Sequence, residues 1–472
     1  MNLKVGLTRP DHFRGRSIHP AEARRDIVGR IRHRAGGCLR RPSSRTEGNL
    51  IALGTSAQPH ADRAFSHRGA VRMLVVLGLI NFINFADRLV IVPLFPLLRD
   101  EFSISDAQLG MLQTVLQVVL ALATVPFALL ADRLNRRMII ATGVVVWSVA
   151  TLLSSVAGSY ALLLVARALV GVGEAAYAPA AQSMISGEFP QQLRSRALAV
   201  FAAAMLIGGA AGQALGGFLG ELSGWRWAFA AIGAPGLILG LSALRLDDPP
   251  RGPKTEVVPV AHLLRVPAYL ALIGSGVLVT FATVSFVTWG PDYMVRYKDF
   301  SMREAGVILG SIALIALVAG VLAGGAIADM LQRRMAYGRV VTVALGFFLA
   351  GPFLLWGLST DDRETLLLAF SIAAFFMSWY HGPVTAIIHD MTPPRAYATS
   401  VGLYMFVTQL AGAFGPSLVG NVSDIFDLQL GLQVAAGVMW AGAFSFLLVI
   451  FFIRKDGLQH PALSSYHQPS ES

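Results

Sequence analysis

The stretch Ala128-Leu-Leu-Ala-Asp132-Arg133-Leu-Asn-Arg136-Arg137 recurs later in the chain as Gly325-Ala-Ile-Ala-Asp329-Met-Leu-Gln-Arg333-Arg334. In both copies an acidic residue precedes a pair of arginines, and each copy closes a pair of long apolar segments. A short charged loop at the same place in both halves of a chain indicates a duplication. We therefore interpret the chain as two parallel repeats.

Composition places these repeats in a membrane. Hydrophobic residues make up 54% of the chain and charged residues 14%, whereas a soluble domain carries about 25% charge. A helix needs about 20 apolar residues to cross a bilayer. We expect twelve such spans, at 73–94, 107–130, 138–157, 161–185, 197–220, 227–246, 268–290, 305–328, 340–358, 364–388, 397–420 and 431–453.

The predicted fold class is an all-α membrane protein with twelve transmembrane helices in two six-helix bundles. Parallel repeats of this kind are typical of secondary transporters, which rock two halves around a central site. The expected regions are a basic tail (1–72), an N-terminal bundle (73–246), a linker (247–267), a C-terminal bundle (268–453) and a second tail (454–472). Proline and mixed charge prevent the linker from continuing a helix.

The first tail has no periodic apolar face and lacks the central apolar run of a signal peptide. We expect it to remain as a disordered extension. It also holds Cys38, the only cysteine of the chain, so the sequence predicts no disulfide framework.

The distribution of charge predicts the orientation. Residues 1–72 hold fifteen Lys and Arg against five Asp and Glu, which accounts for the whole net charge of +10. With the N-terminus in the cytoplasm, later cytoplasmic segments hold fifteen Lys and Arg and external loops hold six. Positive loops stay inside, so we expect both termini in the cytoplasm and the protein in the cell inner (plasma) membrane. The basic excess lies beside a membrane, which favours contact with membrane lipids and argues against nucleic acid.

The repeated loop has residues suited to joining the two halves, because its acid can accept hydrogen bonds from a neighbouring helix start. Here the sequence resembles the major facilitator superfamily, over residues 73 to about 455. Ala128 stands where that family usually has glycine, and Met330 replaces the second-half arginine. The alternative is that the arginines only anchor the topology. The resemblance implies a gating latch, closed in one of two access states, at Asp132, Arg133, Arg136, Asp329 and Arg333.

Glycines at five positions form a stripe of small residues on the fifth span: Gly208, Gly209, Gly212, Gly216 and Gly217. Such spacing lets helix backbones approach closely. We favour packing as their role, and a hinge is the alternative.

Three motifs resemble the spinster branch of the superfamily. They are Asn84-Phe-Ala-Asp87-Arg88 on span one, Ile104-Ser-Asp-Ala-Gln-Leu-Gly110 at the start of span two, and Gly171-Val-Gly-Glu174-Ala-Ala-Tyr177 on span four. The resemblance implies release of lysolipids and sphingosine phosphates, as in animal members. Anion–cation symporters share the span-one motif, so a carrier of small organic acids is the main alternative. A multidrug efflux carrier is another, and a channel or membrane receptor is a remote one.

Ionisable residues inside spans are costly and are functional candidates by default. Those here are Asp87, Arg88, Arg167, Glu174 and His381. Neighbours on a helix point about 100° apart, so Asp87 and Arg88 do not pair with each other. Their depth in the membrane lies between those of Arg167 and Glu174, because each residue adds about 1.5 Å of rise. Cross-helix salt bridges are therefore open in either combination.

Two roles follow for these residues. A carboxylate whose protonation depends on which side the cavity faces is what proton-coupled transport requires, and Glu174 is the first candidate. Asp87 and His381 are further candidates for proton coupling. The alternatives are a fixed ion pair for Glu174 and simple packing for His381. Guanidinium forks suit phosphate and carboxylate, so we expect the substrate to be bound by Arg88, Arg167, Asn84 and Tyr177.

Known enzyme motifs are missing from the sequence. It contains no Gly-Lys-Ser/Thr phosphate loop and no Cys/His cluster with metal-ligand spacing, so we expect no enzyme activity, no cofactor and no metal. The predicted function is secondary active transport of an amphipathic anion such as a lysolipid. The expected partners are a small-molecule or lipid substrate, protons and membrane lipids, and the expected state is a monomer.

Overall fold

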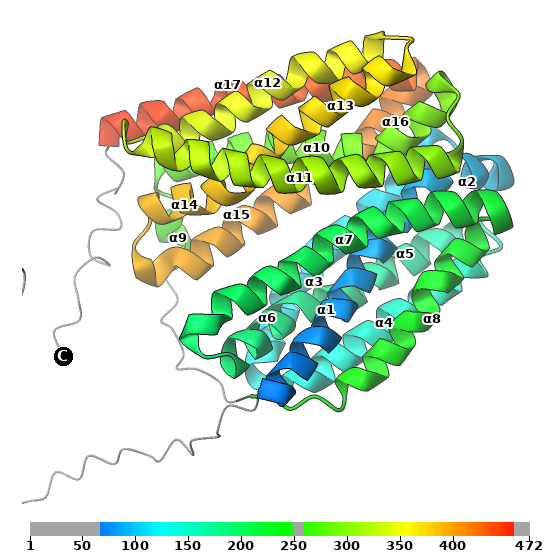
Figure 1. The fold of residues 1–472 in the computed structure, drawn as a ribbon, viewed down its shortest axis with the longest axis horizontal. Coiled ribbons are helices and arrows are strands. Elements are labelled where there is room, and N and C mark those ends of the chain that lie inside the picture. Colours follow the sequence, from blue (N-terminus) through cyan, green and yellow to red (C-terminus); the bar gives the residue numbers. More distant parts are fainter. Residues whose placement is uncertain (1–66, 250–258, 457–472) are drawn as a thin grey trace, which may run out of the picture. The chain divides into compact units, whose positions relative to one another are not determined.

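A computed structural model describes residues 67–249 and 259–456 (Figure 1). Every regular element in these residues is a helix, and twelve helical segments are long and apolar enough to cross a membrane. The predicted class, an all-α protein with twelve spans, is confirmed. Cys38, most of the first tail, part of the linker and most of the second tail lie outside the described residues.

Six spans form the first half. The first consists of α1 (His67–Val90), η1 (Val92–Leu94) and α2 (Phe95–Phe102), and the next two are α3 (Asp106–Arg133) and α4 (Arg136–Ser155). The fourth joins α5 (Tyr160–Ala175) to α6 (Tyr177–Glu188), followed by α7 (Gln191–Ser223) and α8 (Trp225–Ala243). Helix α1 begins at His67, ahead of the expected Met73, because its polar first turns continue the helix beyond the apolar stretch.

The second half begins with the short α9 (Val260–Leu263) and continues through α10 (Pro267–Lys298), α11 (Met302–Gln332) and α12 (Gly338–Ser359). Its fourth span joins α13 (Arg363–Met377), η2 (Ser378–Tyr380) and α14 (His381–Met391). The last two are η3 (Pro394–Ala396) with α15 (Tyr397–Gly412) and α16 (Gly415–Ile425), and α17 (Leu428–Asp456). The fourth span of each half is thus interrupted, beside Tyr177 in one half and His381 in the other.

Matching helix starts support the internal repeat. The second span of each half opens with a capping box, formed by Ser105 with Gln108 in α3 and by Ser301 with Glu304 in α11. In each box the serine accepts a hydrogen bond from a backbone N–H near the helix start, and the third residue on reaches back. The fourth spans also start alike, with the side chains of Ser159 and Asp362 capping α5 and α13. Hydrogen bonds from Thr365 lower the pKa of the Asp362 carboxyl.

The glycines of α7 allow two close helix contacts. A Cβ on Gly208, Gly212 or Gly216 would lie 2.2–2.3 Å from carbonyl oxygens of α1. A Cβ on Gly217 would lie 2.3 Å from the Met302 carbonyl oxygen of α11, in the other half. Close packing is therefore their observed role, since no side chain fits where backbones meet at such distances.

A second crossing between the halves joins α3 and α16. A Cβ on Gly110 would lie 2.4 Å from the carbonyl oxygen of Pro416, and one on Gly420 would lie 2.4 Å from that of Asp106. Figure 1 shows α3 and α7 in the first half and α11 and α16 in the second. The two halves thus meet through backbone contacts of α3 with α16 and of α7 with α11.

Candidate functional site

Asp87 on α1 and Arg167 on α5 form a fully buried ion pair. Asp87 Oδ1 lies 3.4 Å from Arg167 Nη1, and both side chains have 0% exposure. Thr151 on α4 donates a hydrogen bond to Asp87 Oδ2 at 2.6 Å. A buried charge keeps its place when it is paired and hydrogen-bonded, so this pair fixes α1, α4 and α5 together.

Arg88 and Glu174 form the second ion pair of the same two helices. Arg88 Nε donates to Glu174 Oε2 at 2.6 Å, and the side-chain exposures are 19% and 0%. The Arg88 guanidinium also lies 4.5 Å from the centre of the Phe85 ring. Of the two combinations that the sequence left open, the structure has Asp87 with Arg167 and Arg88 with Glu174. The first pair is sealed, whereas the second can be reached through Arg88.

Three polar atoms of the candidate site residues have no hydrogen-bond partner among the described residues: Glu174 Oε1, Asn84 Nδ2 and Arg167 Nε. An unpaired buried polar group costs about 1–3 kcal/mol. Such atoms are therefore suited to receive a proton, a water molecule or a polar group of a ligand. Glu174 offers an acceptor and Asn84 a donor.

Tyr177 lies at the break between α5 and α6, and its hydroxyl donates to the carbonyl oxygen of Leu77. The ring is fully buried and packs edge-on against Trp147, with the ring centres 5.6 Å apart. The hydroxyl is thus already engaged in this conformation.

A cavity at the fourth span of the second half, which we call the central cavity, has a volume of about 290 Å³. His381 lies on its wall beside the break between η2 and α14, together with Tyr380 and Ser378. The rest is mostly apolar and includes Phe286, Leu309, Ile312, Phe370 and Met377. Among the described residues that line this cavity, Gln213 of α7 is the one that comes from the first half.

The charged residues and the cavity thus occupy different halves. Asp87, Arg88, Arg167, Glu174, Asn84 and Tyr177 lie in the first half, and His381 lies on the cavity of the second. Gln213 was missed in the sequence, and its Oε1 has no hydrogen-bond partner among the described residues. Its signal was weak, because it is one amide in a glycine-rich stretch.

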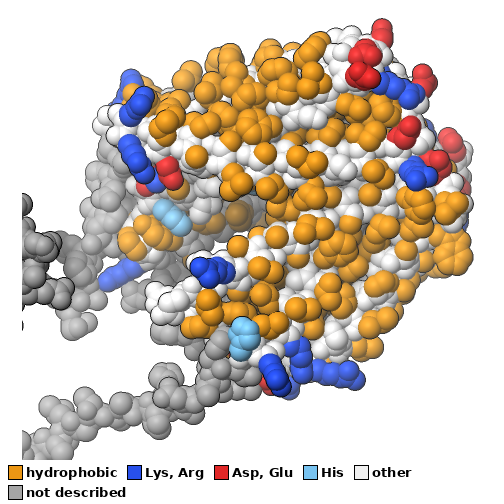
Figure 2. All heavy atoms as spheres, in the orientation of Figure 1, with side chains coloured by type: hydrophobic (Ala, Val, Ile, Leu, Met, Phe, Trp, Pro, Cys, Tyr) orange, Lys and Arg blue, Asp and Glu red, His pale blue; other side chains and the backbone are white. Residues whose placement is uncertain are grey.

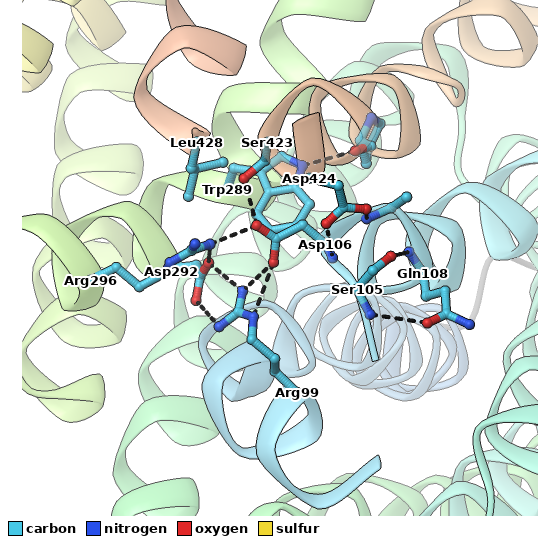
Figure 3. Close-up of polar contacts among 12 residues, drawn as sticks. Arg99, Ser105, Asp106, Gln108, Trp289, Asp292, Arg296, Ser423, Asp424 and Leu428 are labelled. Atoms are coloured by element: carbon cyan, nitrogen blue, oxygen red, sulfur yellow. Dashed lines mark hydrogen bonds and ion pairs between the residues drawn. The ribbon is translucent and has the colours of Figure 1, made fainter. Parts of the chain in front are cut away.

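One end of the molecule is closed by charged residues from both halves (Figure 3). Arg99 of α2 lies 2.7 Å from Asp106 of α3 and 2.8 Å from Asp292 of α10. Arg296 of α10 lies 2.7 Å from Asp106, and Ser423 of α16 donates to the same carboxylate at 2.5 Å. Two arginines and two aspartates therefore balance each other across the interface, and we call these four residues the gate cluster.

Asp424 of α16 adds a further link at this end. Its carboxylate accepts hydrogen bonds from the backbone N–H groups of Asp106 at 2.8 Å and Ala107 at 3.0 Å. These N–H groups form the start of α3, where a negative charge is stabilised by the helix dipole. An acid of the second half thus caps a helix of the first.

Residues of the predicted latch lie at the opposite ends of α3 and α11. Arg136 pairs with Asp248 at 2.6 Å and donates to Ser183 Oγ at 2.9 Å. Asp329 lies 3.7 Å from Arg339, which also pairs with Asp390 at 2.5 Å. Each of these contacts joins residues of the same half, except that Arg136 contacts Asp248, which follows the first half directly in the linker. Arg133 and Arg333 are exposed, and the side chain of Asp132 lies outside the described residues.

The described residues contain no group of three or more His, Cys, Asp or Glu side chains placed to hold a metal ion. Two ion pairs with buried carboxylates, Asp87 with Arg167 and Glu174 with Arg88, join α1 to α5.

Comparison with known proteins identifies the family. The profile of the Major Facilitator Superfamily matches residues 77–338 and 334–468. The chain therefore belongs to this superfamily of membrane transporters.

Within that superfamily, the chain is similar to spinster proteins. It is 29% identical over 443 residues to Protein spinster homolog 1 of Xenopus laevis, covering 84% of each chain. It is also 27% identical over 416 residues to an MFS-type efflux pump of Mycolicibacterium smegmatis, covering 84% of this chain and 96% of that protein.

A solved structure has the same fold. It is a bacterial homolog of the human lysosomal transporter spinster, in an inward-facing and occupied conformation. The TM-score is 0.75 at 23% identity, covering 83% of this chain and 98% of that one. The predicted resemblance to the spinster branch is confirmed, and the chain is an integral multi-pass membrane protein that transports small molecules.

Proposed function

We propose that the chain is a proton-coupled secondary transporter that moves an amphipathic anion such as a lysolipid by alternating access. One observation carries the proposal: the Arg88–Glu174 pair, in which Glu174 keeps a buried oxygen without a hydrogen-bond partner among the described residues. This pair offers a cation for a headgroup and a carboxylate for a proton. The cavity of the second half offers an apolar wall for a chain.

Proton coupling follows from competition for Arg88. When Glu174 is ionised, its charge occupies the Arg88 guanidinium at 2.6 Å. When Glu174 takes a proton, that charge is lost and Arg88 becomes available to a phosphate or carboxylate. Proton binding and substrate binding are then linked through one side chain, which is the free-energy coupling that a secondary transporter needs.

Alternating access is supported by the asymmetry of the two ends. The gate cluster bridges the two halves at one end of the molecule. At the other end, the described contacts of the latch residues do not cross from one half to the other. Figure 2 shows a hollow between the halves on the side where α1 begins and α17 ends. With the termini in the cytoplasm, as the positive loops favour, this conformation faces inward and the gate cluster closes the outer end.

The cargo class follows from the division between charged and apolar walls. An amphiphile needs a charged anchor for its headgroup and an apolar wall for its chain, and the two halves supply one each. A lipid-like cargo is also what the resemblance of the motifs on spans one, two and four to the spinster branch implies. Similarity to an efflux pump keeps multidrug efflux as a second candidate, because a mostly apolar cavity also fits hydrophobic drugs.

Thermal-shift binding of the purified protein to lysophospholipids, compact organic acids and common drugs tests the cargo class. We expect stabilisation by lysophospholipids that saturates with concentration. Tight binding of a small hydrophilic acid without any response to lysophospholipids would overturn the cargo and favour the symporter alternative. Uptake into proteoliposomes with and without a pH gradient tests the coupling.

A further inference from the structure

A second hollow lies on the outer side of α11 and α13, facing away from the central cavity. This groove has a volume of about 660 Å³, and its walls include Ile308, Ile312, Ile315, Phe375 and Phe376. Ile315 is 70% exposed. Because both helices belong to candidate spans, the groove opens toward the hydrocarbon of the bilayer. Figure 2 shows hydrophobic side chains over the middle of the visible face, with charged side chains at its ends.

Only α11 and α13 separate this groove from the central cavity. Ile312 lines both hollows. Next to it, Leu309 and Ala313 point to the cavity, whereas Ile308 and Ile315 line the groove. The same division occurs on α13, so the seam between the two helices is a partition one layer of side chains thick.

The seam closes tightly on one side of the groove. A Cβ on Gly320 would lie 2.3 Å from the carbonyl oxygen of Phe375, and one on Gly324 would lie 2.6 Å from Cα of Trp379. At Ile308 and Ile312 the space is filled by branched and aromatic side chains instead. Such side chains change rotamer more readily than backbones separate, so the partition is softest at Ile312.

The hydroxyl hydrogens of the two serines of the groove are already engaged. Ser311 donates its hydroxyl to the Val307 carbonyl at 2.7 Å, and Ser371 donates to that of Leu367 at 2.6 Å. A phosphate or carboxylate headgroup would find no donor in these serines, whereas a hydrocarbon chain needs none.

We propose that this groove binds the hydrocarbon chain of a single-chain amphiphile taken from the bilayer, with Ile312 as the partition between the groove and the central cavity. The inference deepens the proposed function, since it rests on an amphipathic cargo. It gives the hydrocarbon chain of the ligand a docking site that is separate from Arg88 and Glu174, where the headgroup is proposed to bind.

The test compares two positions on one face of α11. Ile315 lies in the groove and Leu322 lies beyond Gly320, and both are 70% exposed. Each is replaced by the photocrosslinker benzoylphenylalanine, and the protein is reconstituted in phosphatidylcholine vesicles with a trace of radiolabelled lysophosphatidylcholine. We expect several-fold stronger labelling at Ile315, which excess unlabelled lysophosphatidylcholine removes. Equal labelling at both positions that excess ligand does not remove would overturn the proposal and leave only ordinary contact with bilayer lipid.

A second pair of variants tests the partition. Ile312→Trp enlarges the shared wall, and Val318→Trp adds the same ring to a membrane-facing position of α11 that belongs to neither hollow. Uptake of lysophosphatidylcholine from vesicles should fall several-fold in the first and stay unchanged in the second. Equal uptake in both would contradict the role of Ile312.

Binding of lysophosphatidylcholine to the purified wild-type protein tests the proposed function separately. If that binding is absent, the proposed cargo is wrong, whereas the labelling at Ile315 still decides whether the groove binds a hydrocarbon chain.

Discussion

Glu174 and Arg88 share one ion pair, but they differ in what else they contact. One oxygen of Glu174 faces Arg88 and the other has no hydrogen-bond partner among the described residues. Arg88 keeps 19% exposure and a ring contact with Phe85. On these differences we base the proposal that the carboxylate takes the proton and the guanidinium binds the substrate, and each role has its own test.

Replacing Glu174 with glutamine removes the site for the proton and keeps the shape of the side chain. The amide oxygen still accepts a hydrogen bond from Arg88, so folding should survive. We expect uptake into proteoliposomes driven by a pH gradient to fall to the level seen without a gradient. Glu188→Gln, at the end of α6, is the matched control and should keep the gradient dependence. Uptake by Glu174→Gln that still follows the gradient would show that the proton binds elsewhere.

Removing Arg88 tests the headgroup anchor. The variant Arg88→Ala is best made together with Glu174→Gln, so that no buried charge loses its partner. Compared with Glu174→Gln alone, lysophospholipid binding should weaken by roughly tenfold to a hundredfold, because a hydrogen bond to a charged group contributes about 1.5–3 kcal/mol. Arg226→Ala, which removes an exposed cation on Trp225, should leave binding unchanged. Equal binding with and without Arg88 would contradict the anchor.

At this scale the sequence was informative about which residues matter and silent about how they pair. Ionisable residues in spans are rare, so Asp87, Arg88, Arg167 and Glu174 could be found by inspection. Their pairing depends on rotations of α1 against α5 that hydropathy does not encode. Tyr177 illustrates the same limit, because its bond to Leu77 depends on where α6 restarts.

Among the helices, the contact of α1 with α7 depends on the absence of side chains. Gly212→Ala would place a Cβ 2.3 Å from the carbonyl oxygen of Ala86, so the helices must shift. Overpacking of this kind costs typically 1–3 kcal/mol, and we expect a lower melting temperature in detergent. Gly274→Ala on α10 is the control, since nothing lies within 4 Å of its Cβ, and helix propensity favours alanine by about 1 kcal/mol. Equal melting temperatures in the two variants would argue against a tight α1–α7 contact.

The spans themselves could be predicted from the sequence, because twelve apolar stretches leave little choice of fold. The breaks in the fourth spans were harder to foresee. Pro383 indicates an irregularity near His381, and Pro179 stands at the matching place of the first half, two residues after Tyr177, where α6 begins. The sequence analysis did not use Pro179, because hydropathy averaged over a span does not register a single proline.

For the whole molecule, the gate cluster determines which end is closed. Both arginines of the cluster contact the carboxylate of Asp106, and Asp106→Asn removes this negative charge, one of the two in the cluster. We expect the end beside α16 to open more often. Spin labels at Asp100 and Phe426, with Cys38 replaced by serine, should show a longer-distance population that increases at least about tenfold if the link contributes about 1.4 kcal/mol. Glu101→Gln is the control, because its ion pair with Arg226 stays inside the first half. An unchanged distance distribution in Asp106→Asn would show that the cluster does not hold the gate.

The sequence did not reveal the gate cluster, because Arg99 and Asp106 lie in the first half of the chain and Asp292 and Arg296 lie in the second. At the ends of spans they resemble ordinary loop charges. Only the spacing of Asp292 and Arg296, four residues apart on α10, gave a local signal.

Deletion of residues 1–66 tests whether the orientation depends on the basic tail. The cytoplasmic Lys and Arg of the remaining chain should suffice for topology, so transport and the accessibility of engineered cysteines on each side should stay as in the full chain. A truncated protein that inserts normally but does not transport would give the tail a role of its own.

The arginines of the gate cluster keep 23% and 31% exposure, so ions of the surrounding solution reach them. Salt shortens the range of electrostatic attraction to about 8 Å at 0.15 M ionic strength and about 3 Å at 1 M. The ion pairs of the gate cluster are 2.7–2.8 Å long, so even at 1 M salt the attraction reaches as far as these contacts and screening weakens them little. We therefore expect the closed end of this carrier to tolerate large changes in the salinity of the medium.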